Sequence, residues 1–101
     1  MSQSETTKKF SLGRIVATPG ALHALLAAGQ SADEFLARHV TGDWGDLDAE
    51  DRALNDTALI DGSRLLSAYM TRKGERIWVI TEAVDSVGLR YGTTLLLPEE
   101  Y

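Results

Sequence analysis

The clearest hydrophobic pattern lies in the second half of the chain, where two runs of residues alternate between two faces. From Leu65 to Thr71 the odd-numbered positions share one face, and from Ile77 to Glu82 the run is rich in β-branched and aromatic residues. Both features are typical of β-strands. Gly74 can adopt the positive φ that a short turn requires. The pattern predicts a β-hairpin, and because both faces of its second run are largely apolar, we expect that run to be a central strand.

Two further strands are predicted near the ends of the chain. Phe10–Ala17 forms the first, with Gly13 as a bulge position. Gly92–Leu97 forms the last, which Pro98 ends. The residues between the hairpin and this last strand, 83–91, show no periodicity and are predicted to form a loop.

Three helices are predicted between the first strand and the hairpin. The first begins at Pro19, after Thr18 as its N-cap residue, and the others span about residues 32–40 and 49–60. Residues 31–34 have the pattern of a capping box. The side chains expected to face the core are apolar and recur at helical spacing: Leu22, Leu25, Leu26, Phe35, Leu36, Ala53, Leu54, Ala58 and Leu59.

The elements therefore follow one another as β-α-α-α-β-β-β. Helices and strands segregated in this way indicate an α+β fold, with an antiparallel sheet and the helices packed on one face. The chain has 101 residues, which suits one domain. We expect residues 9–101 to form that domain after a flexible tail over residues 1–8.

Composition and charge narrow the classes of function. There is no cysteine, which excludes disulfides and thiolate metal sites, and no histidine spacing or glycine-rich loop indicates a metal or a cofactor. No apolar run suggests a secretion signal or a membrane span, so we expect a cytoplasmic protein with no membrane partner. A net charge of −5 disfavours nucleic acid and favours a protein partner with a basic surface.

The densest negative stretch of the chain follows the second predicted helix. Carboxylates gathered on one surface can dock in a basic channel by charge complementarity. The alternative is that the carboxylates cap and solvate the start of the third helix and that GDWG is a turn whose Trp44 fills the core. The predicted binding residues are this stretch and its tryptophan: Asp43, Trp44, Asp46, Asp48, Glu50 and Asp51.

A second group of residues suggests chemistry. His39 lies in the last turn of a predicted helix, where the helix dipole favours the protonated ring and a role as general acid or base. Ser67, Tyr69 and Thr71 share one face of the hairpin, and Arg64 precedes them, a combination that can bind a phosphate. The alternative is that basic residues are common at helix ends and hydroxyl residues on half-exposed sheets.

Three segments, RHVTGDWGD (38–46), GERIWVITE (74–82) and TTLLLPEEY (93–101), resemble a family of small, uncharacterised bacterial proteins associated with plasmids and phages. The resemblance covers nearly all of Phe10 to Tyr101, although the loop over residues 83–92 is longer here. It implies a mobile genetic element and supplies no catalytic residue. Our first hypothesis is therefore a small acidic protein that binds a macromolecular partner, as an anti-defence inhibitor of a host nuclease complex would.

The predicted architecture is also similar to the barnase/RelE-like ribonuclease superfamily, in which helices precede a curved antiparallel meander. This similarity implies the alternative hypothesis, a metal-independent ribonuclease or toxin. His39 would then be the acid or base, Arg64 the phosphate clamp, and Ser67, Tyr69 and Thr93 supporting donors. The hypothesis requires His39 and Arg64 to reach one phosphate, and the sequence leaves open whether the protein is an enzyme.

Overall fold

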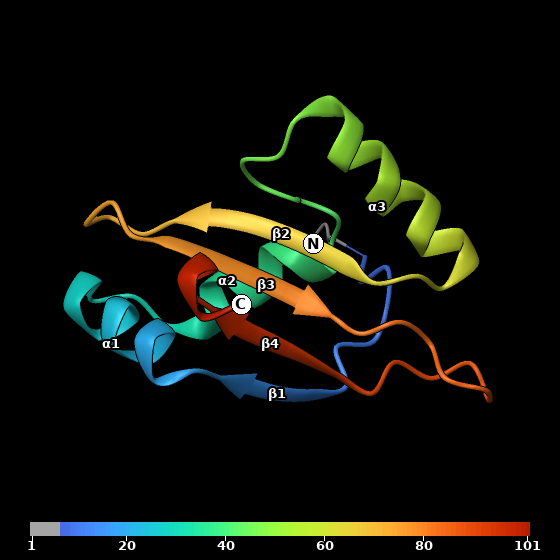
Figure 1. Ribbon diagram of the computed structural model, residues 1–101, viewed down its shortest axis with the longest axis horizontal. Helices are drawn as coiled ribbons and strands as arrows, with labels where there is room; N and C mark the ends of the chain where they lie inside the picture. Colours follow the sequence, from blue (N-terminus) through green and yellow to red (C-terminus); the bar gives the residue numbers. More distant parts are fainter. Residues whose placement is uncertain (1–6) are drawn as a thin grey trace, which may run out of the picture.

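The computed structural model describes residues 7–101, which form an α+β fold around one four-stranded sheet (Figure 1). Residues 1–6, which make up most of the predicted tail, lie outside the described part of the chain. Each predicted helix and strand is present, which confirms the α+β class. The elements are β1 (Arg14–Ala17), α1 (Pro19–Ala28), α2 (Ala32–Val40), α3 (Ala49–Asp61), β2 (Leu65–Met70), β3 (Arg76–Thr81), β4 (Gly92–Leu96) and a final 3-10 turn, η1 (Pro98–Glu100).

The sheet is mixed, which corrects the expectation of a purely antiparallel one. Its strand order is β1-β4-β3-β2, and the meander β2-β3-β4 is antiparallel, with Ser67 opposite Val79. β1 runs parallel to β4, with Ile15 opposite Thr93. A tight turn between neighbouring strands forces antiparallel pairing. Most of the chain separates β1 from β4, so no turn fixes their relative direction.

β1 is shorter than the predicted strand because the chain bends at Gly13. This residue has a φ of +65°, and a Cβ atom there would lie 2.6 Å from the carbonyl oxygens of Arg90 and Tyr91. Gly13 therefore lies just before the start of β1 and does not form a bulge within it. The segment before the bend leaves the sheet, and Phe10 packs against the cluster around Trp44.

The main core lies between one face of the sheet and the helices α1 and α2. The two residues of α2 that were predicted to face the core, Phe35 and Leu36, are buried there. On α1 the prediction is partly wrong, because Leu22 and Leu26 are exposed and alanines face the sheet instead. Alanines allow the helix to approach the sheet closely. The core cluster contains Ala21, Ala24, Leu25, Phe35, Leu36, Tyr69, Ile77, Val79 and Leu95.

α3 lies beside the outer edge of β2 and is not stacked with the other two helices (Figure 1). It contributes to a second cluster, in which Ala58 packs with Trp44 and Leu65. The buried residues of α3 are Asn55 and Ala58, whereas Ala53 and Leu54, predicted to be buried, are exposed. The expectation that all helices pack on one face therefore holds for α1 and α2, and α3 projects from the sheet edge.

The other face of the sheet carries the end of the chain. Trp78 and Leu66 on this face are half-buried, and η1 lies over β3 (Figure 1). The ring of Tyr101 packs edge-on against Trp78, with their centroids 5.7 Å apart. The sheet therefore separates the helix-covered core from a second face that the C-terminal residues partly cover.

Candidate functional site

His39 is buried between α2 and the sheet, and both of its ring nitrogens have hydroxyl partners. Nδ1 lies 2.6 Å from Ser67 Oγ, and Nε2 lies 2.9 Å from Thr81 Oγ1. Thr81 Oγ1 lies 2.7 Å from Thr93 Oγ1, and the Thr93 hydroxyl donates to the backbone oxygen of Leu12 at 2.7 Å. All four residues are buried, with an exposed fraction of at most 1%. This histidine network (His39, Ser67, Thr81 and Thr93) joins α2 to β2, β3 and β4.

The hydrogen bonds of this network fix which nitrogen of His39 carries its proton. Because the Thr93 hydroxyl donates to a carbonyl oxygen, the Thr81 hydroxyl has to donate to Thr93. Thr81 then accepts from His39 Nε2–H, and Nδ1 accepts from the Ser67 hydroxyl. Every donor has one acceptor only if the imidazole is neutral.

The surroundings of His39 also favour the neutral ring. Burial, and to a smaller extent the positive charge of Arg90, lower the pKa of His39 to about 4. The rings of Phe10 and Trp44 pack edge-on against the imidazole, with centroids 5.1 Å and 5.8 Å away. The expectation of a protonated ring at the helix end is therefore wrong, because desolvation in an enclosed apolar site outweighs the helix dipole.

Arg64 lies on the opposite face of the sheet from His39. Its Nη1 donates to the Tyr101 hydroxyl at 2.7 Å, and Tyr101 packs on Trp78. Trp78 alternates along β3 with Ile77, which faces the helix-covered core that contains His39. The sheet therefore stands between the two groups, and one phosphate cannot reach both.

The other residues of the ribonuclease hypothesis are buried. Ser67 and Thr93 belong to the histidine network, and the Tyr69 hydroxyl donates to Asp43 O at 2.6 Å. Burial raises the pKa of Tyr69 to about 12. The face that carries Ser67, Tyr69 and Thr71 is the core side of the sheet rather than a half-exposed surface. The structure does not bring the five proposed catalytic residues into one accessible site.

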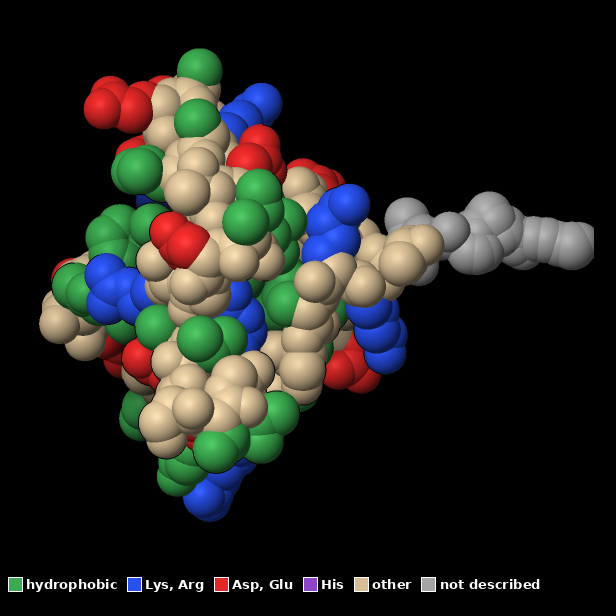
Figure 2. Space-filling model, turned by 90° about the vertical axis from the view of Figure 1, so that its right-hand side faces the viewer, with side chains coloured by type: hydrophobic (Ala, Val, Ile, Leu, Met, Phe, Trp, Pro, Cys, Tyr) green, Lys and Arg blue, Asp and Glu red, His purple; other side chains and the backbone are tan. Residues whose placement is uncertain are grey.

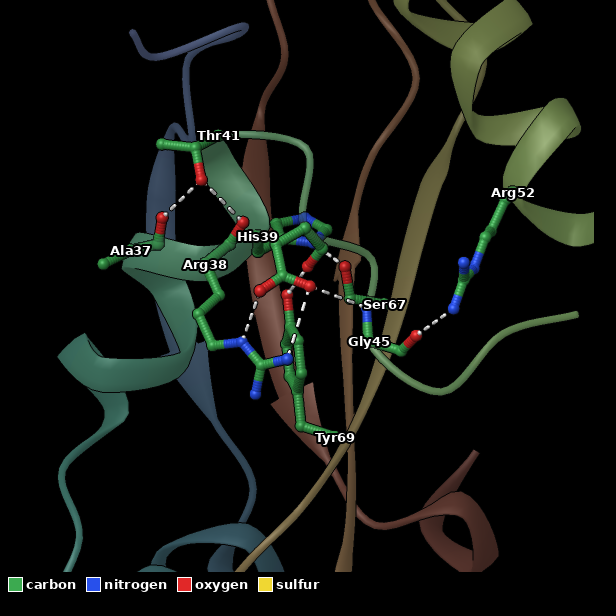
Figure 3. Close-up of polar contacts among 9 residues, drawn as sticks. Ala37, Arg38, His39, Thr41, Gly45, Arg52, Ser67 and Tyr69 are labelled. Atoms are coloured by element: carbon green, nitrogen blue, oxygen red, sulfur yellow. Dashed lines mark hydrogen bonds and ion pairs between the residues drawn. The ribbon is translucent and has the colours of Figure 1, made fainter. Parts of the chain in front are cut away.

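The loop after α2 is held by an ion pair that stacks on a ring (Figure 3). Arg38 Nε donates to Asp43 Oδ2 at 2.7 Å and Nη2 donates to Oδ1 at 3.3 Å, while the guanidinium lies 4.5 Å from the centroid of Tyr69. The backbone N–H of Gly45 donates to the same carboxylate, and Arg52 donates to Gly45 O. The hydrogen bond from Arg38 lowers the pKa of Asp43. Asp43 therefore stabilises the loop from within.

The same loop pairs with the outer edge of β2. Ala68 N donates to Trp44 O at 3.1 Å, and Asp46 N donates to Ala68 O at 2.7 Å. Between them, Gly45 has a φ of +76°, and a Cβ atom there would overlap Ala68 O. The Trp44 ring is buried, and its Nε1 donates to Asp56 Oδ1 at 3.3 Å. Trp44 is therefore a core residue, which corrects its predicted role on a binding surface.

The remaining predicted binding residues divide into two groups. The Asp48 side chain caps α3 by accepting from Asp51 N at 2.8 Å, as the capping interpretation predicted. Asp46, Glu50 and Asp51 are exposed, and their carboxylates form no ion pair or hydrogen bond with another described residue. These three side chains are available to a partner.

We call residues 43–61 the acidic arm. It holds one cationic side chain, Arg52, so the net charge of −5 arises in this segment and the rest of the chain is nearly balanced. In Figure 2, carboxylate and apolar side chains lie together at the top of the molecule, over α3. Seven of the 15 carboxylates of the chain belong to the arm: Asp43, Asp46, Asp48, Glu50, Asp51, Asp56 and Asp61.

Two residues that hold the arm in place were not predicted from the sequence. The Asn55 side chain forms two hydrogen bonds with the backbone of β2. Arg90 donates to the backbone oxygens of Ser63 (2.8 Å), Glu82 (2.9 Å) and Ala58 (3.1 Å). Asn55 could have been identified from the sequence, because it is a polar residue on the side of the helix that faces the core. Arg90 lies in a loop, and nothing in its local sequence marks it.

The fold and the site together define a small α+β protein with a mixed sheet and a rigid acidic arm at one sheet edge. Among residues 7–101, no group of three or more His, Cys, Asp or Glu side chains could hold a metal ion. In the same part of the chain, no helix has both the length and the apolar character needed to cross a membrane. No protein-family model, curated protein or solved structure matches the chain.

Proposed function

We propose that this is a non-enzymatic binding protein that docks its acidic arm on a basic surface of a protein partner. One observation carries the proposal: exposed, unpaired carboxylates of the described chain, Asp46, Glu50 and Asp51, lie on an element that projects from the sheet and is firmly anchored to it. Because the arm is already ordered, docking costs little conformational entropy.

The shape of the arm indicates the kind of basic surface that it fits. α3 has 13 residues and is therefore about 20 Å long. A helix of this length, with carboxylates along it, resembles a short stretch of nucleic acid backbone in its charge. A channel that normally binds nucleic acid offers the complementary surface. In a mobile-element setting the partner would be a host defence nuclease complex, and occupying its channel would inhibit it.

The alternative ribonuclease function receives less support from the geometry. His39, its proposed acid or base, is enclosed by the core and neutral at pH 7, because burial lowers its pKa to about 4. Arg64, the proposed phosphate clamp, is across the sheet and engaged with Tyr101. A general acid or base has to reach the proton that it transfers, which this arrangement does not allow.

Charge reversal of two carboxylates tests the proposal. The double variant Glu50→Lys/Asp51→Lys changes the arm and spares Asp48, whose side chain is needed as the cap of α3. Asp33→Lys/Glu34→Lys is the matched control, because these carboxylates also lie in the first turn of a helix and the net charge changes equally. Proteins captured from a bacterial lysate by the wild type are purified and titrated with all three chains.

We expect a specific partner to bind the control as it binds the wild type. Its affinity for the arm variant should fall by roughly tenfold or more, and wild-type binding should weaken as salt rises. Equal affinities of the arm variant and the control would show that the arm is not the docking element. RNA cleavage that His39→Ala abolishes in a folded protein would replace the proposal with the ribonuclease hypothesis.

A further inference from the structure

α1 is unusual among the helices because it contains no charged residue and is not fully covered. Its sequence, PGALHALLAA, is apolar around most of its circumference, a composition typical of a helix that is covered on all sides. Here only one side packs on the sheet, and Leu22 is 50% and Leu26 82% exposed. These two leucines are four residues apart and form a ridge along the outer side of α1.

A groove runs beside α1, on the side of the turn between β2 and β3. Its volume is about 700 Å³. The turn contributes one cation, Lys73, and one anion, Glu75, to the lining of the groove. The rest of the lining is mostly apolar, with one histidine, and comes from α1 and from the segment after β4: Pro19, Gly20, His23, Ala24, Ala27 and Leu97.

We propose that α1 is a self-association surface, through which two copies of the chain pair about a twofold axis. In this arrangement the Leu22–Leu26 ridge of each copy enters the groove of the other. A ridge and a groove side by side on one helix are what a self-complementary contact needs, since the same patch serves both copies. Burying the two leucines supplies the favourable free energy of association.

The charges of the molecule favour a second copy as the occupant. Near a twofold axis each residue meets its own counterpart, so a charged residue would face a like charge. α1 carries no charge, although the chain as a whole has a net charge of −5 that opposes association elsewhere. Lys73 and Glu75 have opposite charges, so Lys73 of each copy can face Glu75 of the other copy.

The position of α1 leaves the acidic arm free. α1 and α3 lie at opposite ends of the molecule (Figure 1), so copies joined through α1 keep their negatively charged arms apart. The pair would present two arms pointing away from each other. The inference rests on α1 and its groove and is independent of the partner proposed for the arm.

Sedimentation of the full chain tests the inference, with Leu26→Glu as the disruptive variant. Leu26 is 82% exposed, so this change does not disturb the core, and circular dichroism checks the fold. Ile60→Glu is the matched control, because Ile60 is an exposed aliphatic residue on α3, at 89%. We expect a dimer for the wild type and for the control, and a dissociation constant raised by roughly tenfold or more for Leu26→Glu, since two added carboxylates meet near the axis.

Cross-linking gives a second readout because the chain has no cysteine. A short bifunctional maleimide should join Leu26→Cys covalently into a dimer, while it should leave Ile60→Cys without a covalent cross-link. A wild type that sediments as a monomer up to about 100 µM, or equal cross-linking of the two cysteine variants, would overturn the inference. A monomer would leave the ridge to a different protein partner.

Discussion

The side-chain amide of Asn55 forms two hydrogen bonds with the backbone of Leu66. Nδ2 donates to Leu66 O at 2.7 Å, and Oδ1 accepts from Leu66 N at 3.1 Å. Asn55 is 4% exposed. Its amide therefore takes the place that a neighbouring strand would occupy at the outer edge of β2. With the backbone of residues 44–46, it closes an edge that would otherwise be open to another chain.

We expect Asn55→Ala to lower the free energy of unfolding by about 2–3 kcal/mol, because it leaves the N–H and C=O of Leu66 without partners. Urea denaturation measures the change. Thr57→Ala, at an exposed position of α3, is the control for the helix propensity of alanine. If both variants lose the same stability, the amide does not hold α3 to the sheet.

The burial of His39 predicts a pH dependence of stability. The folded pKa of about 4 lies below the ordinary value of 6.5, so between these values the unfolded chain binds a proton that the folded chain excludes. The stabilising contribution is complete above pH 6.5 and is lost as the pH falls toward 4, by roughly 3 kcal/mol in all.

Urea midpoints between pH 7 and pH 4 check this dependence. His39→Gln should be less stable at pH 7, because the network loses its centre, and it should lose this part of the pH slope. His23→Gln is the matched control, because it removes the other histidine of the chain from an exposed position on α1. Nitrogen NMR should find the neutral Nε2–H tautomer of His39. A slope that survives His39→Gln would contradict a buried neutral histidine.

Gly45 is required where the acidic arm meets β2. We expect Gly45→Ala to cost about 3 kcal/mol or more, because it combines an unfavourable positive φ with an overlap against Ala68 O. Gly74→Ala is the control, since Gly74 has a φ of +85° and no atom within 4 Å of an added Cβ. It should cost about 1 kcal/mol. Thermal or urea unfolding of the two variants separates the overlap from the backbone strain.

Arg90 links the end of α3 to β3 and also lowers the pKa of His39. We expect Arg90→Ala to destabilise the fold by about 2–4 kcal/mol, because backbone oxygens lose a charged donor. The pKa of His39 should rise toward its ordinary value, as followed by NMR titration of the imidazole. Arg90→Lys keeps the charge but cannot donate in the same directions. It should therefore lose stability and leave the pKa of His39 nearly unchanged.

The sequence by itself determined the elements whose signals are local. α2 spans the predicted residues, α3 ends one residue later than predicted, and Thr18 caps α1 by accepting from Ala21 N. Periodicity and caps depend on residues within a few positions of one another, so they can be read along the chain. The capping box at Ser31 failed even so: its side chain forms no cap, and Glu34 accepts from Gln30 instead.

Only the tertiary structure decided which polar residues are buried and which remain accessible. His39 lies 28 positions from Ser67 and 42 from Thr81 in the sequence, so no local pattern reveals that they satisfy one another in the core. The direction of β1 has the same origin, since it depends on pairing with a strand at the other end of the chain. The carboxylates of the acidic arm are evident in the sequence. Their rigid display at the edge of β2 comes from long-range contacts of Asn55 and Arg90, which join segments that only folding brings together.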